Sequence, residues 1–324
     1  MPDLRFDNRV AVITGGGRGL GRAHALLLAS RGCKIVVNDP GVSMAGDATD
    51  EGPAEALAAE IRAMGGEAVA STDSVATPEG GKAIIQSALD AFGRIDILIH
   101  SAGNVRRGSL CELAYEDFTA VLDVHLKGAY HVVREAFPHM MAQNYGRIVL
   151  TSSINGLYGK SDNVTYSICK AGFMGLSNTA AIEGQNNNVK SNLIVPAAVT
   201  RMSDGIDTSK FPPMTPEQVA PMVGYLCHED CAATGEMYVA MGGRLARAPD
   251  RTAAAVDPRA RGLGPLDQDR SPGRGLPKTR GSIGPNGRWR TLRRRSRRSV
   301  PAERNLPSRL CPTASWSTSS MASA

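Results

Sequence analysis

The stretch that decides the fold is Thr14-Gly15-Gly16-Gly17-Arg18-Gly19-Leu20-Gly21. It follows the apolar run Val10–Thr14 and opens a helical pattern over residues 22–30. A glycine-rich turn between a strand and a helix lets the backbone approach a pyrophosphate, which then faces the free N–H groups of the first helical turn. The stretch therefore predicts a dinucleotide-binding α/β domain. The expected cofactor contacts here are Gly15, Arg18, Gly19, Leu20 and Gly21.

Asp39 lies at the end of the next apolar run, 24 residues after Gly15. A carboxylate at this place accepts hydrogen bonds from the adenosine ribose hydroxyls and repels a 2′-phosphate. We therefore expect NAD, with NADP the less favoured cofactor. Two alternatives stay open, because Asn38-Asp39-Pro40-Gly41 also suits a simple turn and because Arg18 could attract a 2′-phosphate.

Seven short apolar runs alternate with helical patterns in residues 1–248, as expected for parallel strands joined by crossover helices. The runs are rich in Val, Ile and Leu, which is typical of strands covered on both faces. The sequence predicts a single Rossmann-type, doubly wound, seven-stranded parallel sheet. The predicted strands are 10–14, 34–38, 67–71, 95–101, 147–151, 189–195 and 236–241.

Residues 249–324 differ in composition from the rest of the chain. They contain 15 Arg and one Lys against five acidic residues, a net charge of +11, so that residues 1–248 carry −5 of the overall +6. Nine Pro and seven Gly in this segment predict a disordered tail, and the same bias fits a coding sequence read out of frame. The arginine run over 288–298 could attract nucleic acid or an anionic membrane, but no recognition fold accompanies it. We expect neither partner.

Several classes of protein are excluded by the composition. There is no run of about 18 apolar residues to form a transmembrane helix, and the N-terminus lacks the pattern of a secretory signal. Six scattered cysteines predict reduced thiols and a cytoplasmic location. Cys227-His228-Glu229-Asp230-Cys231 has the residue types of metal ligands but no second pair at zinc spacing, so no metal is expected.

The order of the motifs resembles the short-chain dehydrogenase/reductase family over nearly all of residues 1–248. The glycine spacing carries the resemblance together with Ser153, which is followed 13 residues later by Tyr166-Ser-Ile-Cys-Lys170. Four further stretches are similar to the 3-hydroxyacyl-CoA dehydrogenase module of peroxisomal multifunctional enzyme type 2. They are His125-Leu-Lys-Gly, Tyr145-Gly-Arg-Ile, Ala181-Ile-Glu-Gly and Leu226-Cys-His-Glu.

The resemblance implies catalytic roles for three residues. Tyr166 would transfer the proton as the carbonyl forms or is reduced. Lys170 lies four residues later on the same helical face; it would lower the pKa of Tyr166 and hold the nicotinamide ribose. Ser153 would hydrogen-bond the substrate oxygen. A Tyr-x3-Lys pair alone would more often be a solvated helix face, so the roles depend on the cofactor motif before it.

His125 stands where the family has an asparagine that supports a proton-relay water. An imidazole can accept or donate a hydrogen bond. A relay role and a structural role are therefore both open, and we include His125 among the expected catalytic residues.

The resemblance also extends the set of cofactor contacts. Asp73 matches the residue that contacts adenine, and the backbone after Pro196 would receive the nicotinamide carboxamide, although Ala197 replaces the usual glycine there. The residues added in this way are Asp73, Ser74, Ser101, Ala102, Gly103, Tyr166, Lys170 and Val199. Residues 201–216 correspond to the family's substrate loop.

These parts predict an oxidoreductase that transfers a hydride between NAD and a secondary alcohol or ketone, with a 3-hydroxyacyl-CoA as a candidate substrate. An NADPH-dependent ketoreductase, which Asp39 disfavours, and a catalytically idle nucleotide-binding module are the alternatives. The resemblance also implies a homodimer or homotetramer that pairs the helices over 115–143 and 163–185 around a twofold axis.

Overall fold

The structure, a computed structural model, describes residues 4–42, 52–201 and 213–248, together with the backbone of two short strands, β9 (Gly281–Ile283) and β10 (Trp289–Thr291). The chain divides into two units, Met1–Pro249 and Asp250–Ala324. In the second unit β9 and β10 pair in antiparallel fashion. Apart from these two strands, the predicted tail lies outside the described residues.

An eight-stranded sheet forms the centre of the first unit, in the order β3-β2-β1-β4-β5-β6-β7-β8. The first seven strands are parallel, which confirms the doubly wound Rossmann-type fold. Their bounds agree with the predicted ranges to within two residues at each end. The strands are β1 (Val10–Thr14), β2 (Lys34–Asn38), β3 (Ala68–Ser71), β4 (Ile97–His100), β5 (Gly146–Thr151), β6 (Val189–Ala197), β7 (Met237–Met241) and β8 (Arg244–Arg247).

The eighth strand adds an antiparallel edge that the sequence reading did not include. β8 pairs with β7, with Met241 opposite Arg244. Gly242 and Gly243 form the two-residue connection and have φ of 54° and 74°. Positive φ at both central residues is the conformation that joins twisted strands into a tight hairpin. The side chains of β8 are all exposed, so no burial pattern marks this strand in the sequence.

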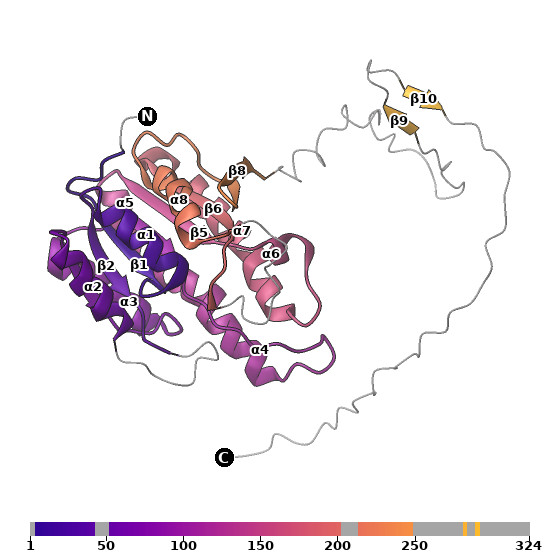
Figure 1. Cartoon of the computed structure of the whole chain (residues 1–324), viewed down its shortest axis with the longest axis horizontal. Coiled ribbons are helices and arrows are strands. Elements are labelled where there is room, and N and C mark those ends of the chain that lie inside the picture. The colour runs from indigo at the N-terminus through magenta and orange to yellow at the C-terminus, as the bar shows by residue number, and fades with distance from the viewer. Residues whose placement is uncertain (1–3, 43–51, 202–212, 249–280, 284–288, 292–324) are drawn as a thin grey trace, which may run out of the picture. The chain divides into compact units, whose positions relative to one another are not determined.

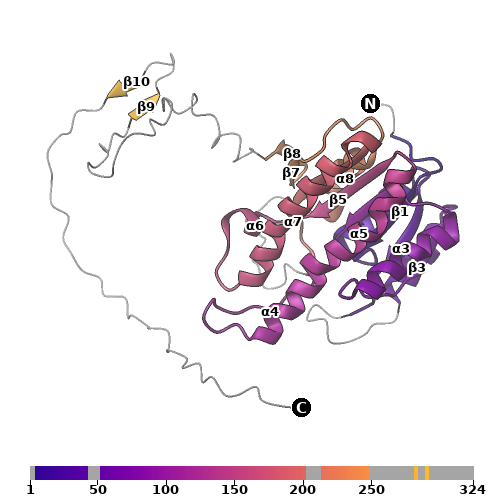
Figure 2. The same cartoon turned by 180° about the vertical axis from the view of Figure 1, so that it is seen from behind.

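Helices cover both faces of the sheet (Figures 1 and 2). One face carries α1 (Gly19–Ala29), α2 (Pro53–Ala63) and α8 (Ala220–Cys227), whose apolar side chains pack with alternate strand residues such as Ile13. The other face carries α3 (Pro78–Phe92), α5 (Gly128–Ala142) and α7 (Val164–Glu183), packed with the intervening residues such as Val12. Because successive side chains of a strand point to opposite faces, a sheet with two covered faces needs the continuous apolar runs of this sequence.

The helix before β5 is interrupted by a π-helical turn. α4 (Tyr115–Leu122) runs into η1 (Asp123–Lys127), which continues directly into α5. Single π-helical turns inside α-helices are frequent at functional sites. His125 lies in this turn and is 1% exposed.

The order of the strands predicts a ligand site at the carboxyl ends of the central strands β1 and β4. From β1 the chain proceeds outward through β2 and β3, then returns to β4 on the other side of β1. Helical connections therefore leave the carboxyl ends of β1 and β4 in opposite directions, which opens a crevice at this point.

Candidate active site

A cavity of about 440 Å³ lies at the carboxyl ends of β1 and β4. Its wall combines the glycine-rich turn after β1, the end of β2 and the segment after β4. Ten of the sequence-predicted cofactor residues line it: Gly15, Arg18, Gly19, Leu20, Gly21, Asp39, Ser74, Ser101, Ala102 and Gly103. The structure therefore brings the glycine motif and the Ser101–Gly103 segment together.

Two glycines of the turn, Gly15 and Gly21, have no room for a side chain. Gly15 has φ +62°, and a Cβ there would lie 2.8 Å from Cα of Ala102. A Cβ on Gly21 would lie 2.2 Å from the carbonyl oxygen of Gly15. α1 begins at Gly19 with no side-chain cap from Arg18, so the first N–H groups of the helix are available at the cavity wall. This arrangement fits the pyrophosphate of a dinucleotide.

Asp39 is held rigidly at the same wall. Its side chain is buried, and one carboxylate oxygen accepts a hydrogen bond from the backbone N–H of Gly17 at 3.2 Å. The other accepts from the backbone N–H of Gly41 at 3.0 Å. Each oxygen keeps a further lone pair, so the carboxylate can accept hydrogen bonds from a ligand in the cavity.

Four predicted cofactor residues do not line this cavity: Asp73, Tyr166, Lys170 and Val199. Asp73 is exposed, and its carboxylate accepts a hydrogen bond from the hydroxyl of Ser71 at 3.1 Å. Val199 is also exposed, and its backbone N–H donates to the carbonyl of Met214 at 2.8 Å. Most of the expected substrate loop, residues 202–212, lies outside the described residues.

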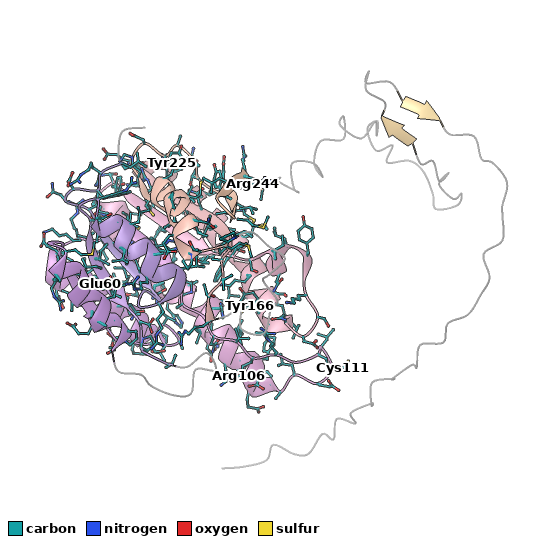
Figure 3. The ribbon with its side chains drawn as sticks, viewed as in Figure 1. Glu60, Arg106, Cys111, Tyr166, Tyr225 and Arg244 are labelled. Carbon is teal, nitrogen blue, oxygen red and sulfur yellow. The ribbon has the colours of Figure 1, made fainter. Side chains whose placement is uncertain are left out.

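Ser153, Tyr166 and Lys170 converge from two neighbouring elements. Tyr166 and Lys170 lie one turn apart on α7, with Nζ of Lys170 5.4 Å from the centre of the Tyr166 ring. Ser153 is the N-cap of α6 (Ile154–Tyr158), where its hydroxyl accepts from the N–H of Asn155 at 3.2 Å. Ser153 also hydrogen-bonds to Tyr166. Figure 3 shows Tyr166 beside these helices, with Arg106 on the segment that precedes α4.

Lys170 is fixed by backbone groups at the end of β5. Its Nζ donates to the carbonyl oxygen of Thr151 at 2.7 Å. Its own carbonyl oxygen accepts from the hydroxyl of Ser152 at 2.8 Å. The side chain is 4% exposed, and burial lowers the pKa of Lys170 to about 7. Desolvation therefore disfavours the charged form of Lys170 in the protein alone.

The pKa of Tyr166 differs from the sequence-based expectation. Burial is the largest cause and raises this pKa above its ordinary value, while the hydrogen bond with Ser153 acts in the opposite direction. The expected lowering by Lys170 is therefore not found in the protein alone.

His125 contacts both the cavity wall and Tyr166. Its Nε2 lies 2.9 Å from the carbonyl oxygen of Asn104 and 3.2 Å from the backbone nitrogen of the same residue. The imidazole meets the Tyr166 ring edge to face, with 5.3 Å between the ring centres and an angle of 82°. Burial, followed by the charge of Lys170, holds the pKa of His125 well below its ordinary value.

Sequence reasoning missed several residues of the site. Thr151 and Asn104 act through their backbone groups, which carry no residue-type signal. His100 ends β4, is fully buried and contacts the hydroxyl of Thr14 through Nδ1 at 2.9 Å. Arg106 lines the cavity and forms an ion pair with Asp117 at 3.0 Å. The position of Asn104 directly after the Ala-Gly pair is the one signal that could have identified it.

The remaining candidate groups are the cysteines and the segment Cys227-His228-Glu229-Asp230-Cys231 at the end of α8. Cys33, Cys169, Cys227 and Cys231 are buried free thiols. Within the described ranges no three metal-ligating side chains gather. In the same ranges no helix is long and apolar enough to cross a membrane.

Comparisons with known proteins match this chain to one family. The model of the short chain dehydrogenase family matches residues 9–209. A crystal structure of a short chain dehydrogenase from Mycobacterium avium superimposes with a TM-score of 0.66 at 35% identity, covering 79% of this chain and 94% of that chain.

Part of a longer protein is similar as well. Peroxisomal multifunctional enzyme type 2 of Drosophila melanogaster is 50% identical over 233 residues, which are 72% of this chain and 38% of the relative. The full-length structure of that enzyme superimposes with a TM-score of 0.62 at 40% identity, covering 76% of this chain and 40% of that chain. The chain thus matches well under half the length of this relative.

Proposed function

The chain belongs to the short-chain dehydrogenase family of NAD(P)-dependent oxidoreductases, and from this premise we propose that it oxidises a 3-hydroxyacyl thioester of coenzyme A with NAD. The observation that carries the proposal is the convergence of Ser153, Tyr166 and Lys170 beside a cavity that presents the carboxylate of Asp39. The 50% identity to a peroxisomal multifunctional enzyme supports the substrate class.

The cofactor choice depends on Asp39. Its buried carboxylate is oriented by the N–H groups of Gly17 and Gly41, which prevents it from rotating away from a ligand. We infer that it binds the ribose hydroxyls of NAD and disfavours the 2′-phosphate of NADP.

Ser153, Tyr166 and Lys170 have different roles in the proposed reaction. When bound, NAD accepts the hydride, and its positively charged ring favours the deprotonated form of Tyr166. Tyr166 takes the proton from the substrate hydroxyl, and Ser153 donates a hydrogen bond to the same oxygen as charge develops on it. Lys170, held by the carbonyl of Thr151, binds the nicotinamide ribose.

The decisive experiment is a steady-state assay of the purified chain with NAD and NADP against 3-hydroxyacyl-CoAs of several lengths and simple secondary alcohols. We expect NADH formation with the hydroxyacyl-CoAs. Turnover restricted to NADPH and a 3-oxoacyl substrate would favour a ketoreductase, and binding of NAD without turnover of any substrate would favour an idle nucleotide-binding module.

We also propose that residues 1–248 act as the dehydrogenase domain of a homodimer or homotetramer. Tyr130 on α5, with Ile168 and Ile182 on α7, expose 52%, 45% and 73% of their surface. Apolar side chains on these two helices fit a twofold helical interface, which is self-complementary. Sedimentation at micromolar concentration should show no monomer.

A cytoplasmic location stays a prediction. The four buried free thiols support a reducing compartment, whereas the multifunctional relatives are named as peroxisomal. Fractionation of cells that express the chain would distinguish the two.

A further inference from the structure

The imidazole of His125 occupies the space next to Gly103 where a side chain would otherwise lie. A Cβ on Gly103 would be 2.5 Å from Cε1 and 3.0 Å from Nε2 of His125, and the three heavy atoms nearest to it all belong to this ring. Gly103 is not among the residues with positive φ, so its backbone would accept another residue. The histidine ring, rather than backbone conformation, therefore requires glycine at position 103.

The same ring holds the next residue through its backbone. Nε2 of His125 lies within hydrogen-bond distance of both the carbonyl oxygen and the amide nitrogen of Asn104. A single ring nitrogen either donates to the carbonyl or accepts from the N–H at one time. In both cases the bond ties Asn104 to η1, and Asn104 and Gly103 both line the cofactor cavity.

On its other side the ring meets the proposed catalytic tyrosine. The edge-to-face contact with Tyr166 is a preferred geometry for two aromatic rings. His125 therefore lies between Tyr166 and the Gly103–Asn104 wall, and the π-helical turn directs it inward at this point.

Among the described residues, the ring has no second hydrogen-bond partner through which a proton could pass. Nδ1 is buried and finds no hydrogen-bond partner in the described part of the chain. A relay needs one nitrogen to receive a proton while the other releases one. Burial and the neighbouring charge of Lys170 also keep the pKa of this imidazole low, so that the neutral form, with its proton on Nε2 toward the Asn104 carbonyl, suits the surroundings best.

We propose that His125 is a positioning residue that fixes the distance between Tyr166 and the Gly103–Asn104 wall of the cofactor cavity, and that it carries no proton in the reaction. This inference rests on the proposed function for its effect on turnover. Its structural part, the packing of His125 against Gly103, can be measured without any substrate.

A double-mutant cycle tests the packing. Gly103→Ala should weaken NAD binding about tenfold and lower the melting temperature, because the new methyl group displaces the ring. In a His125→Ala background the same substitution should change the dissociation constant of NAD by less than about twofold and leave the melting temperature nearly unchanged, since the space is then free. Gly175→Ala is the matched control, because a Cβ there meets no atom within 4 Å. Equal losses from Gly103→Ala in both backgrounds would overturn the proposal.

The pH dependence of turnover separates positioning from proton relay. His125→Phe removes both nitrogens and retains an aromatic ring against Tyr166. We expect kcat to fall less than about tenfold, with the apparent pKa values of the pH–rate profile unchanged. A fall of about 10²-fold or more, together with a displaced pH profile, is the result of a lost relay and would refute positioning.

Nitrogen-15 spectroscopy of histidine-labelled wild-type protein gives a readout that needs neither folding variants nor activity. The His125 signals should show a neutral ring with the proton on Nε2 between about pH 6 and about pH 9. Titration of His125 near its ordinary value would overturn the proposal. Failure of NAD to bind the wild-type protein, with these spectra as expected, would instead overturn the proposed function.

Discussion

The ammonium nitrogen of Lys170 lies 2.7 Å from the carbonyl oxygen of Thr151, the last residue of β5. This bond fixes the lysine from the end of the central sheet, so that its position does not depend on the helix alone. The remaining two N–H groups of the ammonium are left for other partners. The carboxyl ends of the parallel strands therefore form the cavity at β1 and β4 and also orient Lys170 on α7 at β5.

Tyr166→Phe tests the assignment of the general base. The substitution removes one oxygen and keeps the ring against His125, so we expect the fold and NAD binding to change little. kcat should decrease at least about 10²-fold, because a positioned acid–base group is lost. Single-turnover kinetics and calorimetry of NAD binding measure the two effects. Near-normal turnover would assign the proton transfer to another residue.

Lys170 should make the stability of the cofactor-free protein depend on pH. Its pKa is about 7 in the folded protein against an ordinary value of 10.5. Between these values the unfolded chain binds the proton and the folded chain does not. The free energy of unfolding should therefore gain about 1.4 kcal/mol per pH unit from this group as the pH rises above 7.

Comparison with Lys170→Met isolates this contribution. Urea titrations between about pH 7 and about pH 8.5 avoid most of the range where unfolded thiols ionise. The slope of unfolding free energy against pH should be smaller in the variant by up to about 1.4 kcal/mol per pH unit, which is the contribution of one proton. Identical slopes in the two proteins would show that Lys170 is not desolvated as described.

His24 should contribute to acid destabilisation. It is buried on α1, neither ring nitrogen has a hydrogen-bond partner among the described residues, and burial lowers its pKa to about 4. As the pH falls from about 6.5 toward 4, the unfolded chain takes up a proton that the folded chain excludes, and stability is lost.

His24→Leu should reduce this loss. The variant should retain at least the stability of the wild type at neutral pH, because an apolar side chain replaces an unpaired polar ring of similar size. Thermal unfolding across the acid range provides the comparison. A variant that is destabilised by more than about 2 kcal/mol at pH 7 would indicate that the imidazole has a partner after all.

Asp39 should determine the cofactor preference through its charge. Asp39→Asn removes the negative charge and keeps only one of the two oxygens that accept hydrogen bonds from the N–H groups of Gly17 and Gly41. We expect NAD to bind the wild type more tightly than NADP, and the ratio of the two dissociation constants to narrow by about tenfold in the variant. Isothermal calorimetry with both dinucleotides measures this ratio. An unchanged ratio would mean that the carboxylate does not face the 2′ position.

A chain ending at Ala248 should fold and bind NAD as the full chain does. The sheet, the cavity and the three converging side chains all lie within residues 1–248. We expect the free energy of unfolding of the truncated chain, measured by thermal unfolding, to differ from that of the full chain by less than about 1 kcal/mol. Loss of folding on truncation would assign a structural role to residues beyond 248.

The sequence predicted the parts of the site that depend on residue type. The glycine turn, Asp39 and the spacing of Ser153, Tyr166 and Lys170 correspond to fixed backbone and chemical requirements, so the motifs alone were enough to name them as candidates. The parts it did not predict depend on the backbone of distant segments. Thr151 acts through its carbonyl oxygen, and the π-helical turn that directs His125 inward has no propensity signal. The sequence prediction also missed β8, although Gly242-Gly243 is a common two-residue hairpin turn.

β8 is an outer strand of the sheet, and its position affects whether another extended chain can pair with the sheet at this edge. An unpaired strand at a sheet edge offers its N–H and C=O groups to any extended chain that approaches. Here the edge is only four residues long and begins and ends with arginine, at Arg244 and Arg247. If two copies approached edge to edge, like charges would be brought together and the pairing would be short. A short edge with basic residues at both ends therefore disfavours strand pairing between two copies at β8.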